Sequence, residues 1–255
     1  MTETIRAILE NIEEKEQVRI LYSVESGSRA WGFASSDSDY DVRFIYVRCM
    51  EDYLRLDSVR DVIEWQLDET LDVNGWDLQK ALRLLHASNP TLFEWTGSPV
   101  VYRTTPEWEA LRSLIDASFL SGTGLQHYRH MASRNYREYL KGDMVPLKKY
   151  LYVLRSILAC RWILKKRTSP PVLFQELADA ELEPSLRSVV EELLERKRNT
   201  PETGLVPRIT VLNDYIEREL ASLESAAASM EKDQPVGYET LNKAFLAILR
   251  GAVPK

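Results

Sequence analysis

The sequence predicts a protein of the α+β class, in which a small β-sheet lobe over residues 1–104 is followed by an all-helical lobe over residues 105–255. In two stretches of the first lobe, residues 18–25 and 40–46, apolar and polar residues alternate with the period of a strand. Thr105 is a helix-capping residue and is followed by a proline, which is typical of a helix start. From this point to the end of the chain, apolar residues recur with the period of a helix. The 255 residues, of which 44% are hydrophobic, can bury one core or two smaller ones in contact.

The first lobe opens with a short amphipathic helix over residues 3–16, which we expect to cover one face of the sheet. After the two alternating stretches, residues 61–76 predict two more strands joined by a hairpin turn near residues 68–69. A helix over residues 78–88 ends before Pro90, because the residue that precedes a proline disfavours helical backbone angles.

The second lobe is predicted to contain seven helices, which are punctuated by glycine and proline residues and show no internal repeat. Their expected ranges are 107–117, 124–141, 146–166, 172–180, 184–198, 207–231 and 238–250.

Charge is unevenly distributed along the chain. The formal net charge of −6 alone argues against a nucleic-acid partner. Between residues 129 and 167, however, eleven lysines and arginines accompany only two acidic residues, Glu138 and Asp143. A basic segment within an acidic chain is what a polyanionic substrate would require.

Several classes of protein and site are excluded by composition. No apolar run approaches the roughly 18 residues that span a bilayer, and the acidic, helical N-terminus differs from a signal peptide. We therefore expect a cytoplasmic protein that does not contact membranes. Cys49 and Cys160 are too few for a disulfide framework or a zinc cluster.

Two aspartates, Asp39 and Asp41, stand at the start of the second predicted strand. Residues two apart on a strand share a face, so the two carboxylates are expected to lie side by side. Such a pair is repulsive unless a cation lies between the carboxylates, and a hard divalent cation, Mg²⁺ or Mn²⁺, prefers carboxylate oxygens together with substrate phosphates.

The turn before these aspartates carries groups that suit an anion. Gly27 can adopt backbone angles closed to other residues, Ser28 offers a hydroxyl, and Arg29 offers a guanidinium. A glycine-serine turn followed by Asp-x-Asp on a strand therefore indicates a site for a metal and the phosphates of a nucleoside triphosphate.

Three other interpretations of this region compete with a metal site. A solvated loop accounts for Asp37 but leaves the two aspartates of the strand pattern unexplained. An EF-hand starting at Asp37 would need glycine and glutamate where the chain has Val42 and Arg48. A P-loop would need lysine and then serine or threonine where the chain has Phe33 and Ala34. The last two are excluded.

The predicted helix over residues 146–166 presents Lys148, Tyr152 and Arg155 on one face, by their spacing of i, i+4 and i+7. Two cations flanking an aromatic ring could neutralise a triphosphate and stack a base. The alternative is an ordinary solvated helix whose lysines extend along its apolar surface.

The stretch GSRAWGFASSDSDYDVRF resembles the signature of the DNA polymerase beta nucleotidyltransferase superfamily. More narrowly, it is similar to predicted bacterial and phage nucleotidyltransferases associated with RNA repair. The stretches DVNGWDLQKALRLL, SNPTLFEW and LKKYLYVLRSILACRWI also resemble that group, so the resemblance extends to about residue 180. It implies that the first lobe is a catalytic lobe with a small mixed sheet.

Polymerase-like transfer uses two metal ions, so a third carboxylate is expected. Asp72 is the first candidate, because its apolar neighbours face the core and leave it on the same side of the sheet as Asp39 and Asp41. Asp77 is the fallback, although its position just before the helix over residues 78–88 predicts an N-cap instead.

Together these features predict a metal-dependent nucleotidyltransferase, in which an acceptor hydroxyl attacks the α-phosphorus of a nucleoside triphosphate and pyrophosphate leaves. Asp39 and Asp41 would hold two ions, and Asp72 would hold the ion that activates the acceptor. Gly27 and Ser28 would bind the β and γ phosphates, and the basic helix face would close over the nucleotide.

The acceptor is less constrained than the donor. The resemblance implies RNA, such as a 3′ end under repair, while a protein or small-molecule hydroxyl also stays open because the motif binds only the donor. A non-catalytic nucleotide-binding or antitoxin-like module is the alternative class. A third carboxylate favours the enzyme over that module.

Overall fold

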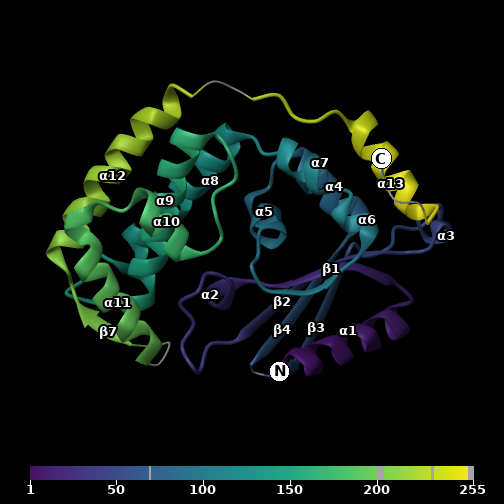
Figure 1. The fold of residues 1–255 in the computed structure, drawn as a ribbon, viewed down its shortest axis with the longest axis horizontal. Coiled ribbons are helices and arrows are strands. Elements are labelled where there is room, and N and C mark those ends of the chain that lie inside the picture. The colour runs from purple at the N-terminus through teal and green to yellow at the C-terminus, as the bar shows by residue number, and fades with distance from the viewer. Residues whose placement is uncertain (69, 200–203, 231–232, 252–255) are drawn as a thin grey trace. The chain divides into compact units, whose positions relative to one another are not determined.

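The computed structural model of the protein describes residues 1–68, 70–199, 204–230 and 233–251 (Figure 1). Within these ranges the chain forms two compact units, which we call the sheet unit and the helical unit. Across the described residues, no helix is both long enough and apolar enough to cross a membrane.

Each unit is assembled from separated segments of the chain. The sheet unit comprises Met1–Ala30, Asp39–Phe119 and the chain from Pro235, and the helical unit comprises Trp31–Ser38 and Leu120–Gln234. The loop between the glycine-serine turn and the two aspartates therefore belongs to the helical unit, although the residues on either side of it belong to the sheet unit.

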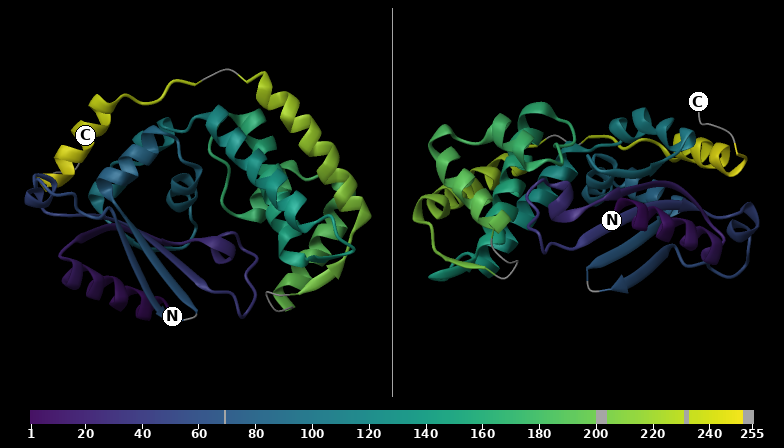
Figure 2. Two further views of the ribbon diagram at one scale, coloured as in Figure 1. Left: turned by 180° about the vertical axis from the view of Figure 1, so that it is seen from behind. Right: turned by 60° about the horizontal axis from the view of Figure 1, so that its bottom comes forward.

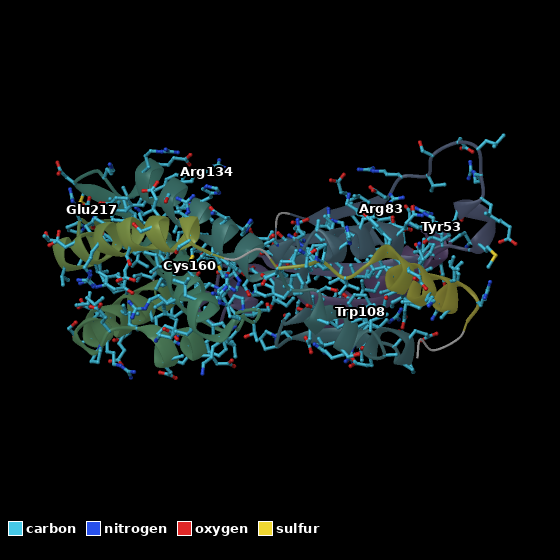
Figure 3. All side chains as sticks on the ribbon, turned by 90° about the horizontal axis from the view of Figure 1, so that it is seen from above. Tyr53, Arg83, Trp108, Arg134, Cys160 and Glu217 are labelled. Carbon is cyan, nitrogen blue, oxygen red and sulfur yellow. The ribbon has the colours of Figure 1, made fainter. Side chains whose placement is uncertain are left out.

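These boundaries differ from the predicted lobes, 1–104 and 105–255. The residues just after Thr105 stay with the sheet unit because Trp108 and Ile115 are buried in its core. Trp108 is labelled among the side chains in Figure 3. The C-terminal helix also joins this core, through Leu241 and its neighbours.

The sheet unit is built on five strands in the order β3-β4-β2-β1-β5. Their bounds are β1 (Arg19–Glu25), β2 (Tyr40–Val47), β3 (Val62–Asp68), β4 (Leu71–Asp77) and β5 (Val101–Thr104). Strands β2 and β4 are parallel and the other pairs are antiparallel, so the predicted mixed sheet is confirmed. The predicted hairpin turn reaches Glu69, which lies outside the described residues.

The two faces of this sheet are covered by different helices (Figure 2). Helix α1 (Thr2–Glu16) buries Ile5, Leu9 and Ile12 against the face that carries Val42, as the amphipathic pattern predicts. The opposite core contains residues of β1 and β2 together with residues of the other large helices of the unit. Those helices and the short ones are α2 (Gly27–Ala30), α3 (Met50–Tyr53), α4 (Leu78–His86), α5 (Pro90–Thr96), α6 (Pro106–Glu109), α7 (Arg112–Ala117) and α13 (Tyr238–Leu249).

The helical unit packs around one central helix, α9, whose residues 157–160 are all fully buried. Its helices are α8 (Ser121–Tyr139), α9 (Leu147–Lys166), α10 (Phe174–Glu181), a short 3-10 helix (Pro184–Leu186), α11 (Arg187–Asn199) and α12 (Thr210–Ala228). The unit is not all-helical, since β6 (Met144–Pro146) and β7 (Leu205–Pro207) form a short antiparallel ribbon where helix starts were predicted. The predicted end of α12, residue 231, lies outside the described residues.

Candidate functional site

The turn after β1 approaches the start of β2 so closely that only glycine fits. Gly27 has a φ of +59°, which side chains rarely tolerate, and a Cβ atom there would lie 2.1 Å from Oδ2 of Asp41. The backbone N–H of Ser26 donates to the carbonyl oxygen of Asp41 at 2.8 Å. The glycine turn and the carboxylate of Asp41 are therefore immediate neighbours, and Ser28 follows in the first turn of α2.

Asp41 and Asp72 lie directly beside each other on the parallel strands β2 and β4, where they are register partners. Val42 next to Asp41, and Leu71 and Val73 on either side of Asp72, are buried in the core under α1, which leaves both carboxylates on the other face. The side chain of Asp72 is 55% exposed and that of Asp41 is 32% exposed. The structure thus brings these two aspartates together as strand parity predicts.

A guanidinium group lies between the two carboxylates. Nη2 of Arg43 donates to Oδ1 of Asp41 at 2.7 Å and to Oδ2 of Asp72 at 2.8 Å. Its Nη1 donates to the carbonyl oxygens of Val42 and Asp72, both at 3.1 Å. Sequence reasoning missed Arg43, although its position two residues after Asp41 placed it on the same face of β2.

Asp39 lies at the edge of this group rather than inside it. Its carbonyl oxygen accepts from Nε of Arg29 at 3.1 Å, and its carboxylate is exposed. The Arg29 guanidinium stacks 3.7 Å from the centre of the Tyr40 ring. Arg29 therefore ties the glycine turn to the start of β2.

The electrostatic environment of Asp41 favours a cation. Burial raises the pKa of Asp41 above its usual range, and the negative charges of Asp72 and Asp39 raise it further, while Arg43 opposes them. A bound positive charge stabilises the ionised form of this cluster.

Behind Asp41 lies a buried acid, Glu25, that sequence reasoning also missed. Its Oε1 accepts from the backbone N–H of Asp41 at 2.8 Å, and its Oε2 accepts from the hydroxyl of Tyr102 on β5. Burial raises the pKa of Glu25 above its usual range. The available signal was a carboxylate at the end of a buried strand, immediately before the glycine-serine turn.

Asp77, the fallback ligand, lies at the far end of β4. It is 4% exposed, caps α4 by accepting from the N–H of Gln79 at 2.7 Å, and accepts from the hydroxyl of Tyr53 at 2.8 Å. It lies five positions after Asp72 in β4, which corresponds to roughly 17 Å along a strand. The N-cap prediction is confirmed, and a role for Asp77 beside Asp41 is contradicted.

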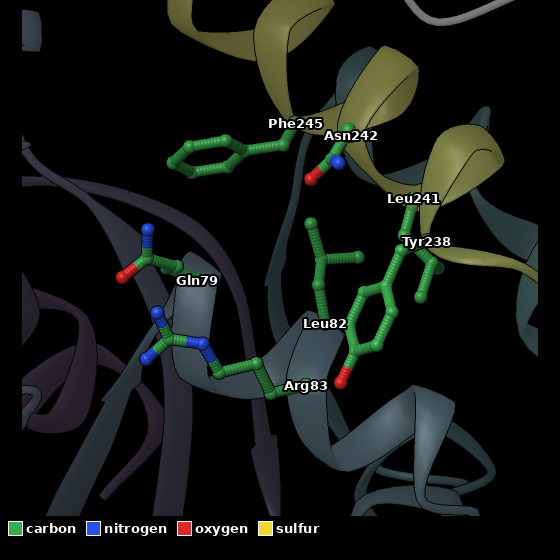
Figure 4. Close-up of a pocket in the computed structure, with 7 residues that line it drawn as sticks. All are labelled: Gln79, Leu82, Arg83, Tyr238, Leu241, Asn242 and Phe245. Atoms are coloured by element: carbon green, nitrogen blue, oxygen red, sulfur yellow. The ribbon is translucent and has the colours of Figure 1, made fainter.

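A pocket of the sheet unit is lined by residues that do not belong to the acidic cluster. It opens between α4 and α13 (Figure 4). Its lining consists of Gln79, Leu82, Arg83, Tyr238, Leu241, Asn242 and Phe245.

In the helical unit, the predicted nucleotide-binding face of α9 is partly covered by the unit's own residues. Lys148 and Tyr152 are half-buried, and the Tyr152 ring meets the Trp31 ring edge-on at 5.1 Å. Arg155 is only 1% exposed, lies 4.6 Å from the centre of the Trp31 ring, and donates through Nε to the carbonyl oxygen of Val172 at 3.3 Å.

Arg155 therefore differs from the solvent-facing nucleotide contact that was expected. The cause is the loop of residues 31–38, whose Trp31 packs on this side of α9. The burial points to a packing role for Arg155 within the helical unit.

The donors of the acidic cluster suit a hard cation. They are all carboxylate oxygens, which Mg²⁺ and Mn²⁺ prefer, and a positive group already bonds to Asp41 and Asp72 together. In the part of the chain that the structure describes, no three acidic, histidine or cysteine side chains lie close enough together to enclose a metal ion. The residues thus fit a cation held mainly by Asp41 and Asp72, with Asp39 nearby.

Comparison with known proteins places the chain among relatives. It is 46% identical over 240 residues to the uncharacterized protein YcgL of Bacillus subtilis (strain 168), and the alignment covers 93% of this chain and 92% of that protein. A crystal structure of a nucleotidyltransferase-like protein from Exiguobacterium sibiricum 255-15 aligns over 97% of this chain and 80% of that chain. The identity is 15% and the TM-score 0.32, which supports no argument about fold or function.

The family assignment is direct. The family described as the RNA repair pathway DNA polymerase beta family matches residues 1–247, which is nearly the whole chain. This match confirms the resemblance carried by the glycine-serine turn and the aspartates of β2. The chain belongs to the RNA repair pathway DNA polymerase beta family.

Proposed function

We propose that the protein is a metal-dependent nucleotidyltransferase that moves a nucleoside monophosphate from a nucleoside triphosphate to a hydroxyl group of RNA, with release of pyrophosphate. One observation carries the proposal: Asp41 and Asp72 are register partners on adjacent strands, share a bound cationic group, and lie beside the Gly27 turn. Family membership supports the reaction class and the link to RNA repair.

The roles of the residues follow from their positions. Asp41, the more buried carboxylate, and Asp39 are proposed to hold two ions, Mg²⁺ or Mn²⁺, and Asp72 to hold the ion on the acceptor side. When bound, such ions neutralise phosphate oxygens and lower the pKa of the attacking hydroxyl. The backbone around Gly27 and the hydroxyl of Ser28 are proposed to bind the β and γ phosphates.

Glu25 acts behind this site as a positioning residue. Because it accepts from the backbone N–H of Asp41, it fixes the start of β2 next to the glycine turn. It is buried and engaged by Tyr102, so it does not reach the substrate.

A labelling assay tests the proposal. With Mg²⁺ or Mn²⁺ and labelled nucleoside triphosphates, the wild-type protein should transfer label to an RNA pool, and Asp41→Asn should not. Asp116→Asn provides a matched control, because Asp116 is an exposed aspartate of α7, a helix outside the acidic cluster. Labelling of RNA by Asp41→Asn at the wild-type rate would contradict the assignment.

Parallel reactions distinguish the acceptors. Label found on the protein itself or on added small hydroxyl compounds, but not on RNA, would keep the transferase and replace the acceptor. Nucleotide binding without transfer to any of the three would instead support the non-catalytic nucleotide-binding module.

A further inference from the structure

Arg43 occupies the place between Asp41 and Asp72 that the proposed function gives to a metal ion. One nitrogen atom, Nη2, lies 2.7 Å from an oxygen of Asp41 and 2.8 Å from an oxygen of Asp72. The same guanidinium is anchored by two backbone carbonyl oxygens, those of Val42 and Asp72. A single cationic group therefore satisfies both carboxylates at once.

When no metal is bound, this arrangement reduces the electrostatic repulsion among the carboxylates. Asp41 is two-thirds buried, and both Asp72 and Asp39 are near enough to act on it. Like charges held this close destabilise the folded chain unless a positive charge is bound between them. Arg43, with its side chain 16% exposed, supplies that charge from the neighbouring position of the same strand face.

We propose that Arg43 is an internal counter-cation that competes with the divalent metal for Asp41 and Asp72. This inference rests on the proposed function, because it assumes that these two carboxylates are metal ligands. Metal binding then requires the guanidinium to release at least one of them.

Geometry supports competition rather than joint occupancy. Mg²⁺ binds carboxylate oxygens at about 2.0–2.1 Å and accepts little distortion of its coordination. A guanidinium nitrogen less than 3 Å from the same oxygens would lie within a few ångströms of the metal, where the two positive charges repel strongly. The backbone of Arg43 is held in β2, so release of a carboxylate requires only rotation about the bonds of the Arg43 side chain.

The first test measures the affinity for Mn²⁺ alone by isothermal titration calorimetry on the full chain. Arg43→Met keeps an unbranched side chain of about the length of the arginine stem and removes the charged guanidinium, so its Kd for Mn²⁺ should be at least about tenfold lower than that of the wild type. Arg43→Lys keeps the charge but loses the planar fork, and its Kd should be intermediate. An unchanged or higher Kd for Arg43→Met would overturn the proposal, because it would mean that Arg43 supports the metal ligands.

Arg19→Met serves as the matched control for this measurement. Arg19 is also an arginine on a strand of the sheet unit, and its Nη1 pairs with Oε1 of Glu107 at 2.8 Å. Within the described residues, this guanidinium forms no ion pair with a second carboxylate. Its removal should leave Mn²⁺ affinity unchanged, and a tenfold gain here as well would show that the effect is one of net charge only and overturn the specific role of Arg43.

The second test needs no metal. In EDTA, Arg43→Met should lower the thermal midpoint by about 2–4 °C, and adding Asp72→Asn to it should recover most of that loss, because one of the repelling charges is removed. A loss that Asp72→Asn does not recover would indicate simple packing and overturn the counter-cation role.

The two proposals fail separately. Equal Mn²⁺ affinity in the wild type and Arg43→Met overturns the competition and leaves the transferase assignment standing. Tighter Mn²⁺ binding by Arg43→Met in a protein that transfers no nucleotide supports the competition and contradicts the transferase.

Discussion

The two ends of strand β4 show how the same residue type acquires opposite roles. Asp72, near the start of the strand, is 55% exposed and shares the Arg43 guanidinium with Asp41. Asp77, at the end of the strand, is 4% exposed and caps α4 while accepting from the Tyr53 hydroxyl. The carboxylate of Asp72 is accessible to a ligand, whereas the carboxylate of Asp77 is buried and used in hydrogen bonds that stabilise the fold.

The difference arises from the structure that the chain adopts immediately after each aspartate. After Asp72 the strand continues, so its side chain stays on an open sheet face beside the parallel strand β2. After Asp77 the chain turns into α4, whose first N–H groups need an acceptor. The same substitution should therefore reduce activity when it is made at Asp72 and reduce stability when it is made at Asp77.

The largest expected effect separates the two positions by activity. Asp72→Asn should reduce nucleotide transfer at least about 100-fold, equivalent to about 3 kcal/mol of transition-state stabilisation, because a neutral amide is a poor ligand for the ion on the acceptor side. Asp77→Asn should retain transfer, because asparagine is also a good N-cap. Initial rates of label transfer measure both variants, and equal losses at the two ends of β4 would contradict the division of roles.

A smaller effect separates them by stability. Asp77→Ala should lower the free energy of unfolding by about 2–3 kcal/mol, since it removes the N-cap of α4 and leaves the Tyr53 hydroxyl without its acceptor. Asp72→Ala should change it by no more than about 0.5 kcal/mol, because that side chain is exposed. Urea denaturation of both variants in EDTA measures the difference, and a larger loss for Asp72→Ala would reverse the comparison.

Local sequence rules were sufficient for the positions of these aspartates. The alternation along β4 assigned Asp72 to the face of Asp41, and the helical spacing after Asp77 assigned it to a cap. Both inferences use only neighbours in the chain, and the α+β class with its mixed sheet was predictable from similar local patterns and from the family resemblance.

Contacts between distant segments were not predictable in this way. Arg43 meets Asp72 only because β4 lies parallel to β2, although the two strands are not consecutive in the chain. Glu25 meets Tyr102 across 77 positions of sequence. Neither contact produces a periodic pattern of residues from which it could be predicted in a single sequence.

The same limit explains two further differences between prediction and structure. Arg155 matched the spacing of an exposed face, but Trp31 packs against it from a loop more than a hundred residues earlier. The unit boundaries shifted because α13, at the end of the chain, packs into the core of the sheet unit. Amphipathic spacing shows that a face is apolar or polar, but not which distant segment covers it.

The smallest effect concerns the pH dependence of stability at the buried end of β4. Burial raises the pKa of Asp77 above its ordinary value of 3.8, and this outweighs the hydrogen bonds from Tyr53 and Gln79 that lower it. The folded chain therefore holds this proton to a higher pH than the unfolded chain does. The corresponding stabilisation is complete below the unfolded pKa and is lost as the pH rises through the folded pKa.

Asparagine does not titrate, so the free energy of unfolding of Asp77→Asn minus that of the wild type should rise as the pH increases from 4 towards 7. Urea denaturation across that range measures it. Asp57→Asn gives the opposite sign as a control, because the hydrogen bonds from Arg55 lower the pKa of the exposed Asp57 carboxyl and its stabilisation is lost as the pH falls. A difference for Asp77→Asn that stays flat or falls with pH would contradict this prediction, because it would mean that the N-cap and Tyr53 favour the ionised form of Asp77 more than burial disfavours it.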